Sequence, residues 1–228
     1  MDPDPFDREG FSGRLPLFPL PNVVLFPHAF LPLHIFEPRY RSMTRGALEG
    51  ERLIGMALLK PGWEGDYYGN PDVHEVIGVG KIIEEERQED GRFNLILHGV
   101  ARARIVEIVS RDPYRTARIE VLEERPREGH KYERLRHLLL QFYSGLLKKI
   151  LKDAAPPPPD DLPLGAVCDL VSAVLDFAPP VKQALLEDLD VGARCERLIS
   201  LLQDSRAPGL GEGWGSDARP WPPGESAN

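Results

Sequence analysis

The spacing of apolar residues changes once along this chain of 228 residues, and the change divides it into two kinds of secondary structure. Residues 13–125 carry short apolar runs broken by polar residues, glycine and proline, which is typical of β-strands. Residues 129–205 carry apolar positions at the three- and four-residue intervals of amphipathic helices. We therefore expect an α+β fold with a β-rich subdomain at 13–125 and a helical bundle at 129–205.

The clearest turn in the β-rich part is the dipeptide Asp90-Gly91. It separates two segments of β-competent residues, 79–87 and 93–97, and such a dipeptide is a strong hairpin signal. We expect Gly99 to separate the second segment from a further strand at 101–109, in which Arg102 and Arg104 point outward and Ala103 and Ile105 point inward.

Two further elements are expected before this hairpin. Residues 23–26 suit a short strand that the neighbouring prolines confine to an edge or a kinked position. Glu37-Pro38 predicts the start of a helix, because proline fits the first helical turn, and Gly50 predicts its end. Five or six strands with one short helix indicate a small, strongly curved sheet or half-open barrel.

The helical part begins with an amphipathic segment at 132–150, which the prolines 156–159 end. Further helices follow, of which one begins at Pro179 and another has Asp190 as its N-cap. Residues 127–152 hold seven basic and two acidic groups, whereas residues 153–204 hold three basic and ten acidic groups. This asymmetry favours packing of the first helix against the others, and the alternative is a basic face for a partner.

The two ends of the chain and its two cysteines indicate the cellular compartment of the protein. Residues 206–228 are rich in proline and glycine without an apolar period, so we expect them, with residues 1–12, to be disordered ends. The acidic N-terminus lacks the features of a signal peptide, and no apolar run is long enough to span a membrane. Cys168 and Cys195 sit in helical patterns and are expected to be reduced, with a disulfide between them as the alternative, so we expect a cytoplasmic protein without a membrane partner.

Motifs for catalysis and cofactor binding are missing from the sequence. No lysine precedes Ser or Thr, so a phosphate-binding loop of the GxxxxGK[ST] type cannot occur, and GxSxG is absent as well. The six histidines do not pair at helical spacing, which argues against a metal site. We expect no catalytic residue, no metal and no cofactor.

Aromatic and charged residues at two places suit a binding surface instead. One place is a Gly- and Pro-containing loop around residue 65, and the other is the expected strand-to-helix turn around residue 37. The candidate substrate-binding residues are Phe36, Arg39, Tyr40, Trp63, Tyr67 and Tyr68. Two structural alternatives stand beside this reading: the loop aromatics close one end of the barrel, and an ion pair holds the turn.

Several blocks of the sequence resemble a known family. The blocks LPLFPLPNVVLFP, LPLHIFEPRYRSM, LIGMALL and DGRFNLILHGVARARI, in this order, resemble the N-terminal substrate-recognition domain of Lon proteases. KQALLEDLDVGARCERLISLL resembles the helical part that follows it there, so that the resemblance covers residues 13–204. IFEPRYR and GWEGDYYG look most like free-standing bacterial versions. The resemblance implies a PUA-like pseudobarrel followed by a helical bundle.

The resemblance also implies a function. It indicates recognition of unfolded or degron-bearing polypeptides in protein quality control. An ATPase or protease partner in trans and an oligomeric state are left open by the sequence. A full-length Lon carries an ATPase module and a Ser–Lys peptidase module after this region. Because this sequence lacks the ATPase motif, we expect a non-enzymatic binding protein.

Two other function classes stay open from the sequence. The first is an RNA-binding PUA-like module with a basic stripe of Arg102, Arg104, Arg115 and Arg118, against which the formal net charge of −8 argues. The second is a small-molecule enzyme whose residues converge only in three dimensions.

Overall fold

The computed structural model describes residue 6 and residues 10–65, 67, 69–151 and 158–203. These residues form a mixed α+β structure, with six strands in one sheet and five α-helices. The strands are β1 (Arg14–Leu20), β2 (Phe30–Ile35), β3 (Leu53–Leu58), β4 (Val76–Arg87), β5 (Phe93–Ser110) and β6 (Thr116–Leu122). The helices are α1 (Pro38–Glu49), α2 (His130–Leu151), α3 (Leu164–Val174), α4 (Pro179–Glu187) and α5 (Val191–Gln203), with a 3₁₀ turn η1 at Trp63–Gly65.

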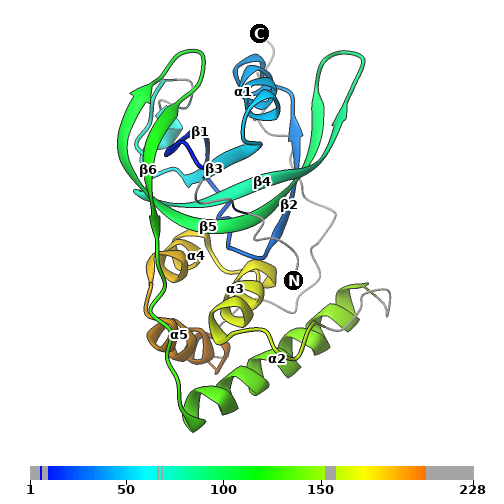
Figure 1. Ribbon diagram of the computed structural model, residues 1–228, viewed down its shortest axis with the longest axis vertical. Helices are drawn as coiled ribbons and strands as arrows, with labels where there is room; N and C mark the ends of the chain where they lie inside the picture. Colours follow the sequence, from blue (N-terminus) through cyan, green and yellow to red (C-terminus); the bar gives the residue numbers. More distant parts are fainter. Residues whose placement is uncertain (1–5, 7–9, 66, 68, 152–157, 204–228) are drawn as a thin grey trace.

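Five of the strands close into a ring. The sheet order is β2-β5-β4-β3-β1-β6, and β6 also pairs with β5, which joins the two ends of the series β5-β4-β3-β1-β6. The pair β1–β3 is parallel and the other pairs are antiparallel. β2 stands outside the ring on the first half of β5, and the hairpins β4–β5 and β5–β6 project beyond it (Figure 1).

The expected break at Gly99 is wrong, because β5 runs through it as one strand of 18 residues. Glycine is needed there for close approach: a Cβ atom on Gly99 would lie 2.0 Å from the carbonyl oxygen of Phe26, and one on Gly78 would lie 2.0 Å from that of Leu25. The strand expected at residues 23–26 is also wrong. This segment is irregular and presses its backbone against the ring, and its Leu25 and Phe26 side chains are buried.

The local signals for α1 are confirmed. Glu37 is extended, Pro38 occupies the first turn, and Gly50 follows the last helical residue. The side chains of Tyr40, Met43 and Ala47 are buried, so one face of α1 covers the core between the hairpins.

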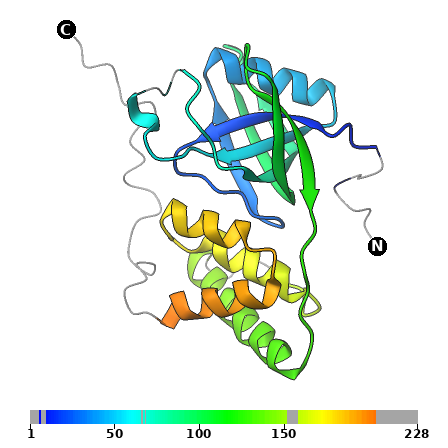
Figure 2. The ribbon, with the colours of Figure 1, turned by 90° about the vertical axis from the view of Figure 1, so that its left-hand side faces the viewer.

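The four C-terminal helices lie together on the side of the ring opposite to α1 (Figures 1 and 2). The predicted caps are confirmed: Pro179 opens α4, and a carboxylate oxygen of Asp190 accepts hydrogen bonds from the backbone N–H groups of Gly192 (3.0 Å) and Ala193 (3.1 Å). None of the described helices is long and apolar enough to cross a membrane. Cys168 and Cys195 are buried free thiols.

A buried polar network joins the ring to the helices. Arg102 points outward from the ring, as predicted, but its side chain is buried beneath the helices and donates to both carboxylate oxygens of Asp169 on α3. Arg102 also pairs with Glu124 at 2.8 Å, and Glu124 pairs with Arg194 of α5 at 2.5 Å. The predicted alternation therefore holds, but helices cover the outer face of β5 at this point.

Ion pairs also link the basic start of the helical part to α5. Arg127 pairs with Asp190 at 2.6 Å, and Lys131 pairs with Glu196 at 2.6 Å. These contacts match the interpretation of the charge asymmetry as complementary packing. The larger apolar core is continuous from the strands and α1 into α2–α5, while a smaller one fills the ring and includes Phe6 near the N-terminus.

Candidate functional site

The junction between β2 and α1 brings the first three candidate residues close together. Ile35 ends β2 as a buried residue, and the chain then turns at Phe36 and Glu37 into α1. Tyr40, on the first turn of the helix, is buried and packs its ring on Phe18 of β1 at a centroid distance of 4.4 Å. Phe36 is half-buried beside His34.

The loop after β3 places two more candidates against this junction. The rings of Trp63 and Tyr67 meet edge to face with centroids 6.0 Å apart. The Tyr67 hydroxyl donates a hydrogen bond to a carboxylate oxygen of Glu37 at 3.2 Å. The sixth candidate, Tyr68, lies outside the described residues.

Glu37 and Arg39 hold the turn together. Their side chains form an ion pair of 3.1 Å, and the Arg39 guanidinium lies over the rings of Tyr40 (4.6 Å) and Tyr67 (5.6 Å). Such cation–π contacts are worth about 0.5–1 kcal/mol each at exposed sites. The buried Nη2 atom of Arg39 has no hydrogen-bond partner among the described residues. An ion pair therefore holds this turn, as the structural alternative to a binding role predicted. Arg39 also contacts the two aromatic rings beside it.

These residues surround an apolar hollow of about 200 Å³, which we call the aromatic pocket. Buried Phe18 and Tyr40 lie on its core side, while Phe36 and Tyr67 come from the turn and the loop. Burial raises the pKa of Tyr40 above its ordinary value, so its phenol stays neutral at physiological pH. Its full lining is Phe18, Leu20, Pro21, Asn22, Leu33, His34, Ile35, Phe36, Glu37, Tyr40 and Tyr67.

The pocket unites three of the six candidates, Phe36, Tyr40 and Tyr67. Trp63 and Arg39 contact Tyr67 from outside the lining. Sequence reasoning missed the opposite wall, which the end of β1 and the chain after it supply from Leu20 to Asn22. The available signal was the proline-rich block LPLFPLPN, which was used for the family resemblance and not as a source of site residues.

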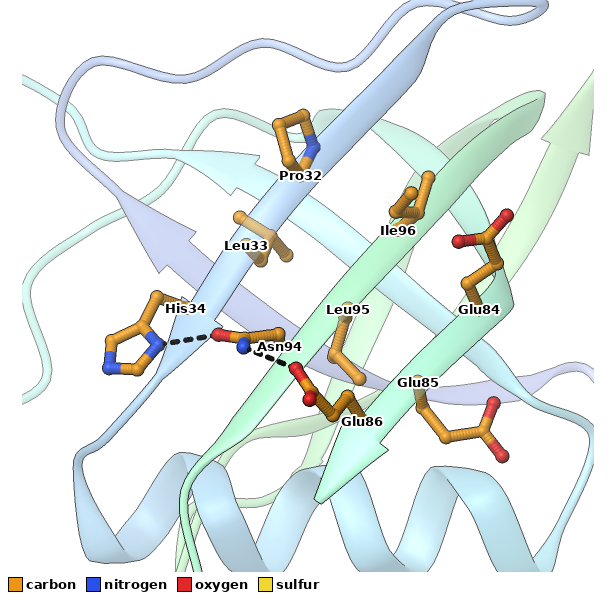
Figure 3. A pocket seen from close by; sticks show the side chains of 9 residues that line it. All are labelled: Pro32, Leu33, His34, Glu84, Glu85, Glu86, Asn94, Leu95 and Ile96. Carbon is orange, nitrogen blue, oxygen red and sulfur yellow. Dashed lines mark hydrogen bonds between the residues drawn. The ribbon is translucent and has the colours of Figure 1, made fainter. Parts of the chain in front are cut away.

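A second hollow, of about 510 Å³, lies across β2, β5 and β4, and we call it the outer hollow. Figure 3 shows a hydrogen-bonded row across its three strands: the Nδ1 atom of His34 lies 2.8 Å from the amide oxygen of Asn94, whose Nδ2 donates to Glu86 at 2.8 Å. Apolar Pro32 and Ile96 lie beside Glu84 in the next row. The outer hollow is thus apolar at its centre and acidic along β4.

The other function classes find little support in the geometry. Within the described residues, no three His, Cys, Asp or Glu side chains cluster in a way that could hold a metal ion. The proposed basic stripe is wrong: Arg102 and Arg115 are buried, while Arg104 pairs with Glu120 and Arg118 pairs with Glu107. Its arginines therefore do not form a free cationic surface for RNA.

Comparison with known proteins gives the family. The profile described as "ATP-dependent protease La (LON) substrate-binding domain" matches residues 14–204. The chain belongs to the family of Lon substrate-binding domains. It is 28% identical to Lon protease 2 of Myxococcus xanthus over 218 residues, covering 90% of this chain and 25% of that relative. Lon protease of Anaeromyxobacter dehalogenans is 26% identical, with 88% of this chain and 24% of the relative covered.

Solved structures of Lon N-terminal domains have the same fold. A Lon N-terminal domain protein from Xanthomonas campestris matches with a TM-score of 0.58 and 24% identity, covering 82% of this chain and 97% of that one. The N-terminal domain of a Mycobacterium avium complex Lon protease matches with a TM-score of 0.61 and 18% identity, covering 84% and 99%. The chain spans about a quarter of the length of the curated relatives it matches.

Proposed function

We propose that this chain is a non-catalytic recognition protein that binds unfolded or degron-bearing polypeptides through the aromatic pocket. The observation that carries the proposal is the match to a substrate-binding domain over residues 14–204, a span that contains every residue lining that pocket. The matched relatives are named as proteases, and the chain aligns with about a quarter of their length. We also propose an ATPase or protease acting in trans as a further partner.

The size and chemistry of the aromatic pocket support an apolar side chain as its occupant. Pockets for drug-sized ligands measure about 300–1,000 Å³, whereas this one measures about 200 Å³. Folded proteins bury most of their large apolar side chains, so a site of this kind distinguishes unfolded chains from folded ones. Glu37 and the Tyr67 hydroxyl add polar groups at the turn, where a bound main chain can find hydrogen-bond partners.

One pocket of this size gives weak binding, which suits a receptor for many clients. Affinity rises when several segments of one client engage several copies, without any new kind of contact. We place this activity in the cytoplasm, and we take the closed strand ring as PUA-like and residues 129–205 as a helical subdomain. Each of these assignments rests on the family resemblance and the sequence pattern.

The direct test is equilibrium binding of a permanently unfolded client, such as a reduced and carboxymethylated protein, measured by fluorescence anisotropy. Tyr67→Ala and Trp63→Ala should each weaken binding by about five- to tenfold, which corresponds to about 1–1.4 kcal/mol per anchor. Leu138→Ala is the matched control, because Leu138 is an exposed apolar residue on α2, away from the pocket. It should bind as the wild type does.

Two results would contradict the proposal. In one, the wild-type chain binds no unfolded client at any accessible concentration. In the other, client binding is unchanged by Tyr67→Ala and Trp63→Ala but is weakened by Leu138→Ala. A steep loss of RNA retention with rising salt would instead favour the RNA-binding class.

A further inference from the structure

β2 has one edge without a strand partner. Its residues pair antiparallel with β5 from Phe30 opposite His98 to Ile35 opposite Phe93. Within the described part of the chain, no strand pairs with its other edge, and β2 is the terminal strand in the sheet order. An unpaired edge exposes main-chain donors and acceptors that can accept a further strand.

The direction of the main-chain groups on this edge follows from the hydrogen bonds at its start. The N–H of Gly99 donates to the carbonyl of Ala29 at 2.8 Å, so that carbonyl faces β5. Main-chain groups alternate in direction along a strand, and those of Phe30, Pro32 and His34 therefore face away from β5. Pro32 has no N–H to offer, and at this outward position it removes no bond to β5.

A second free edge in the same arm is protected against strand addition by charged residues, whereas β2 carries a single proline, Pro32, on its free edge. β3 pairs with β4 only as far as Lys81, and beyond it β4 carries the consecutive charged residues Glu84, Glu85, Glu86 and Arg87. Charged edges oppose pairing with another chain. β2 has the sequence FLPLHI, without Lys, Arg, Asp or Glu, and its Phe30 side chain is 64% exposed.

A strand added to β2 would run between two different hollows. The aromatic pocket borders the end of β2 at Leu33 to Phe36, and the outer hollow covers Pro32 and His34 (Figure 3). Successive side chains of a strand point to opposite faces of a sheet. One set of side chains of the added strand therefore faces the aromatic pocket, and the alternate set lies over the outer hollow.

The charge of the outer hollow favours basic residues among the side chains of the added strand that lie over it. Glu85 is engaged by Arg52, whereas Glu84 and Glu86 have no ion-pair partner among the described residues. Apolar Pro32 and Ile96 line the same hollow and can hold the methylene stem of a long basic side chain. The complementary occupant is a segment with a lysine or arginine between apolar residues.

Resting on the function proposed above, we propose that β2 accepts an extended segment of the bound polypeptide as an added strand. Apolar side chains of that segment face the aromatic pocket, and long basic side chains reach over the outer hollow toward Glu84 and Glu86 on β4. Main-chain pairing supplies affinity without regard to sequence, and the two hollows supply a preference for alternating apolar and basic residues.

The test uses fluorescent nine-residue peptides in an anisotropy titration at low and high salt. A peptide alternating leucine with lysine should bind about tenfold more tightly than one alternating leucine with glutamate, and the difference should shrink at high salt. Glu84→Gln with Glu86→Gln should remove most of the difference. N-methylation of the lysine–leucine peptide at every second residue should weaken binding about tenfold in one register only, because a strand pairs through alternate residues.

A matched pair of protein variants isolates the main chain of β2. His34→Pro removes an outward N–H together with the imidazole, and His34→Ala removes the imidazole alone. Proline should weaken peptide binding about tenfold relative to alanine, the value of one hydrogen bond, with circular dichroism showing both variants folded. Strand addition is wrong if the two N-methylated peptides bind equally and if His34→Pro and His34→Ala bind the peptide equally. Polypeptide recognition still stands in that case if Tyr67→Ala weakens binding of the unfolded client. If the wild type binds neither client nor peptide, both proposals fail.

Discussion

Arg102 of β5 and Asp169 of α3 form a two-point ion pair shielded from solvent at the boundary between the strand ring and the helices. One guanidinium nitrogen lies 2.8 Å from a carboxylate oxygen, and the side chains of the pair are 2% and 1% exposed. Arg102 also donates to the carbonyl of Leu186 at 3.0 Å. The pair thus holds α3 and the end of α4 on the sheet, and it fixes where the helices sit relative to the ring.

Asp169→Ala should destabilise the protein by about 3–5 kcal/mol, because it leaves the buried guanidinium groups of Arg102 and Arg194 with Glu124 as their remaining carboxylate. Urea unfolding measures the change. Glu107→Gln breaks an ion pair with Arg118 that is more than half exposed at the carboxylate, and it should cost less than about 1 kcal/mol. Equal costs for the two variants would show that the buried pair has no special role.

Unfolding of the strand ring and the helices should be coupled. The larger core runs from Ile35 in β2 through Met43 in α1 to Val171 in α3 and Leu198 in α5 without interruption. Native-state hydrogen exchange should therefore give opening free energies for α3 and β4 within about 1 kcal/mol of each other. Much earlier exchange throughout α3 than throughout β4 would instead mean that residues 129–205 unfold independently.

Alanine at Gly99 and at Gly145 should have opposite effects. At Gly99 the new Cβ would lie 2.0 Å from the carbonyl oxygen of Phe26, so the segment before β2 must move away. We expect a loss of several kcal/mol, in the range of overpacked or strained sites, in a thermal or urea unfolding measurement. Gly145 lies within α2 with no atom within 4 Å of such a Cβ, and alanine there should stabilise the helix by about 0.5–1 kcal/mol.

His98 should make stability fall in mildly acidic solution. Burial, with a smaller contribution from His28, holds the pKa of His98 below its ordinary value of 6.5. The unfolded chain then binds a proton more readily than the folded one near and below pH 6.5, so this contribution to stability is complete at higher pH and decreases as the pH falls. The imidazole signals in an NMR titration should give a midpoint below 6.5, and His98→Gln should reduce the decrease between pH 7 and 5. A midpoint above 6.5 would contradict this.

Local signals in the sequence were sufficient for the elements they begin or end. Proline at position 38, aspartate at position 190 and the dipeptide Asp90-Gly91 act through the residues beside them, and the structure has the expected helix starts and hairpin. The change in apolar spacing predicted the α+β class, which the structure has. These local signals could not predict contacts between segments that are far apart in the sequence.

Arg102 illustrates what local patterns miss. Alternation correctly places it on the outer face of β5, but only the packing of α3, some 67 residues further along the chain, decides that this face is buried. Gly99 was predicted to end a strand because glycine often interrupts strands. Its actual role is to leave room for the backbone of Phe26, a contact that the local sequence does not show. In the same way, aromatic clustering found Phe36, Tyr40 and Tyr67. The wall from Leu20 to Asn22 was missed because it comes from a distant segment, the end of β1, that packs beside them.

The central claim is that unfolded polypeptide binds at the aromatic pocket beside β2. Chemical-shift mapping on the ¹⁵N-labelled chain, titrated with a carboxymethylated client, measures this residue by residue. The account predicts that the largest shift changes fall on β2, on the turn at Phe36–Arg39 and on Trp63 and Tyr67, while α2 and the β5–β6 hairpin change little. Changes concentrated on α2 or on that hairpin, with the aromatic pocket unaffected, would contradict it.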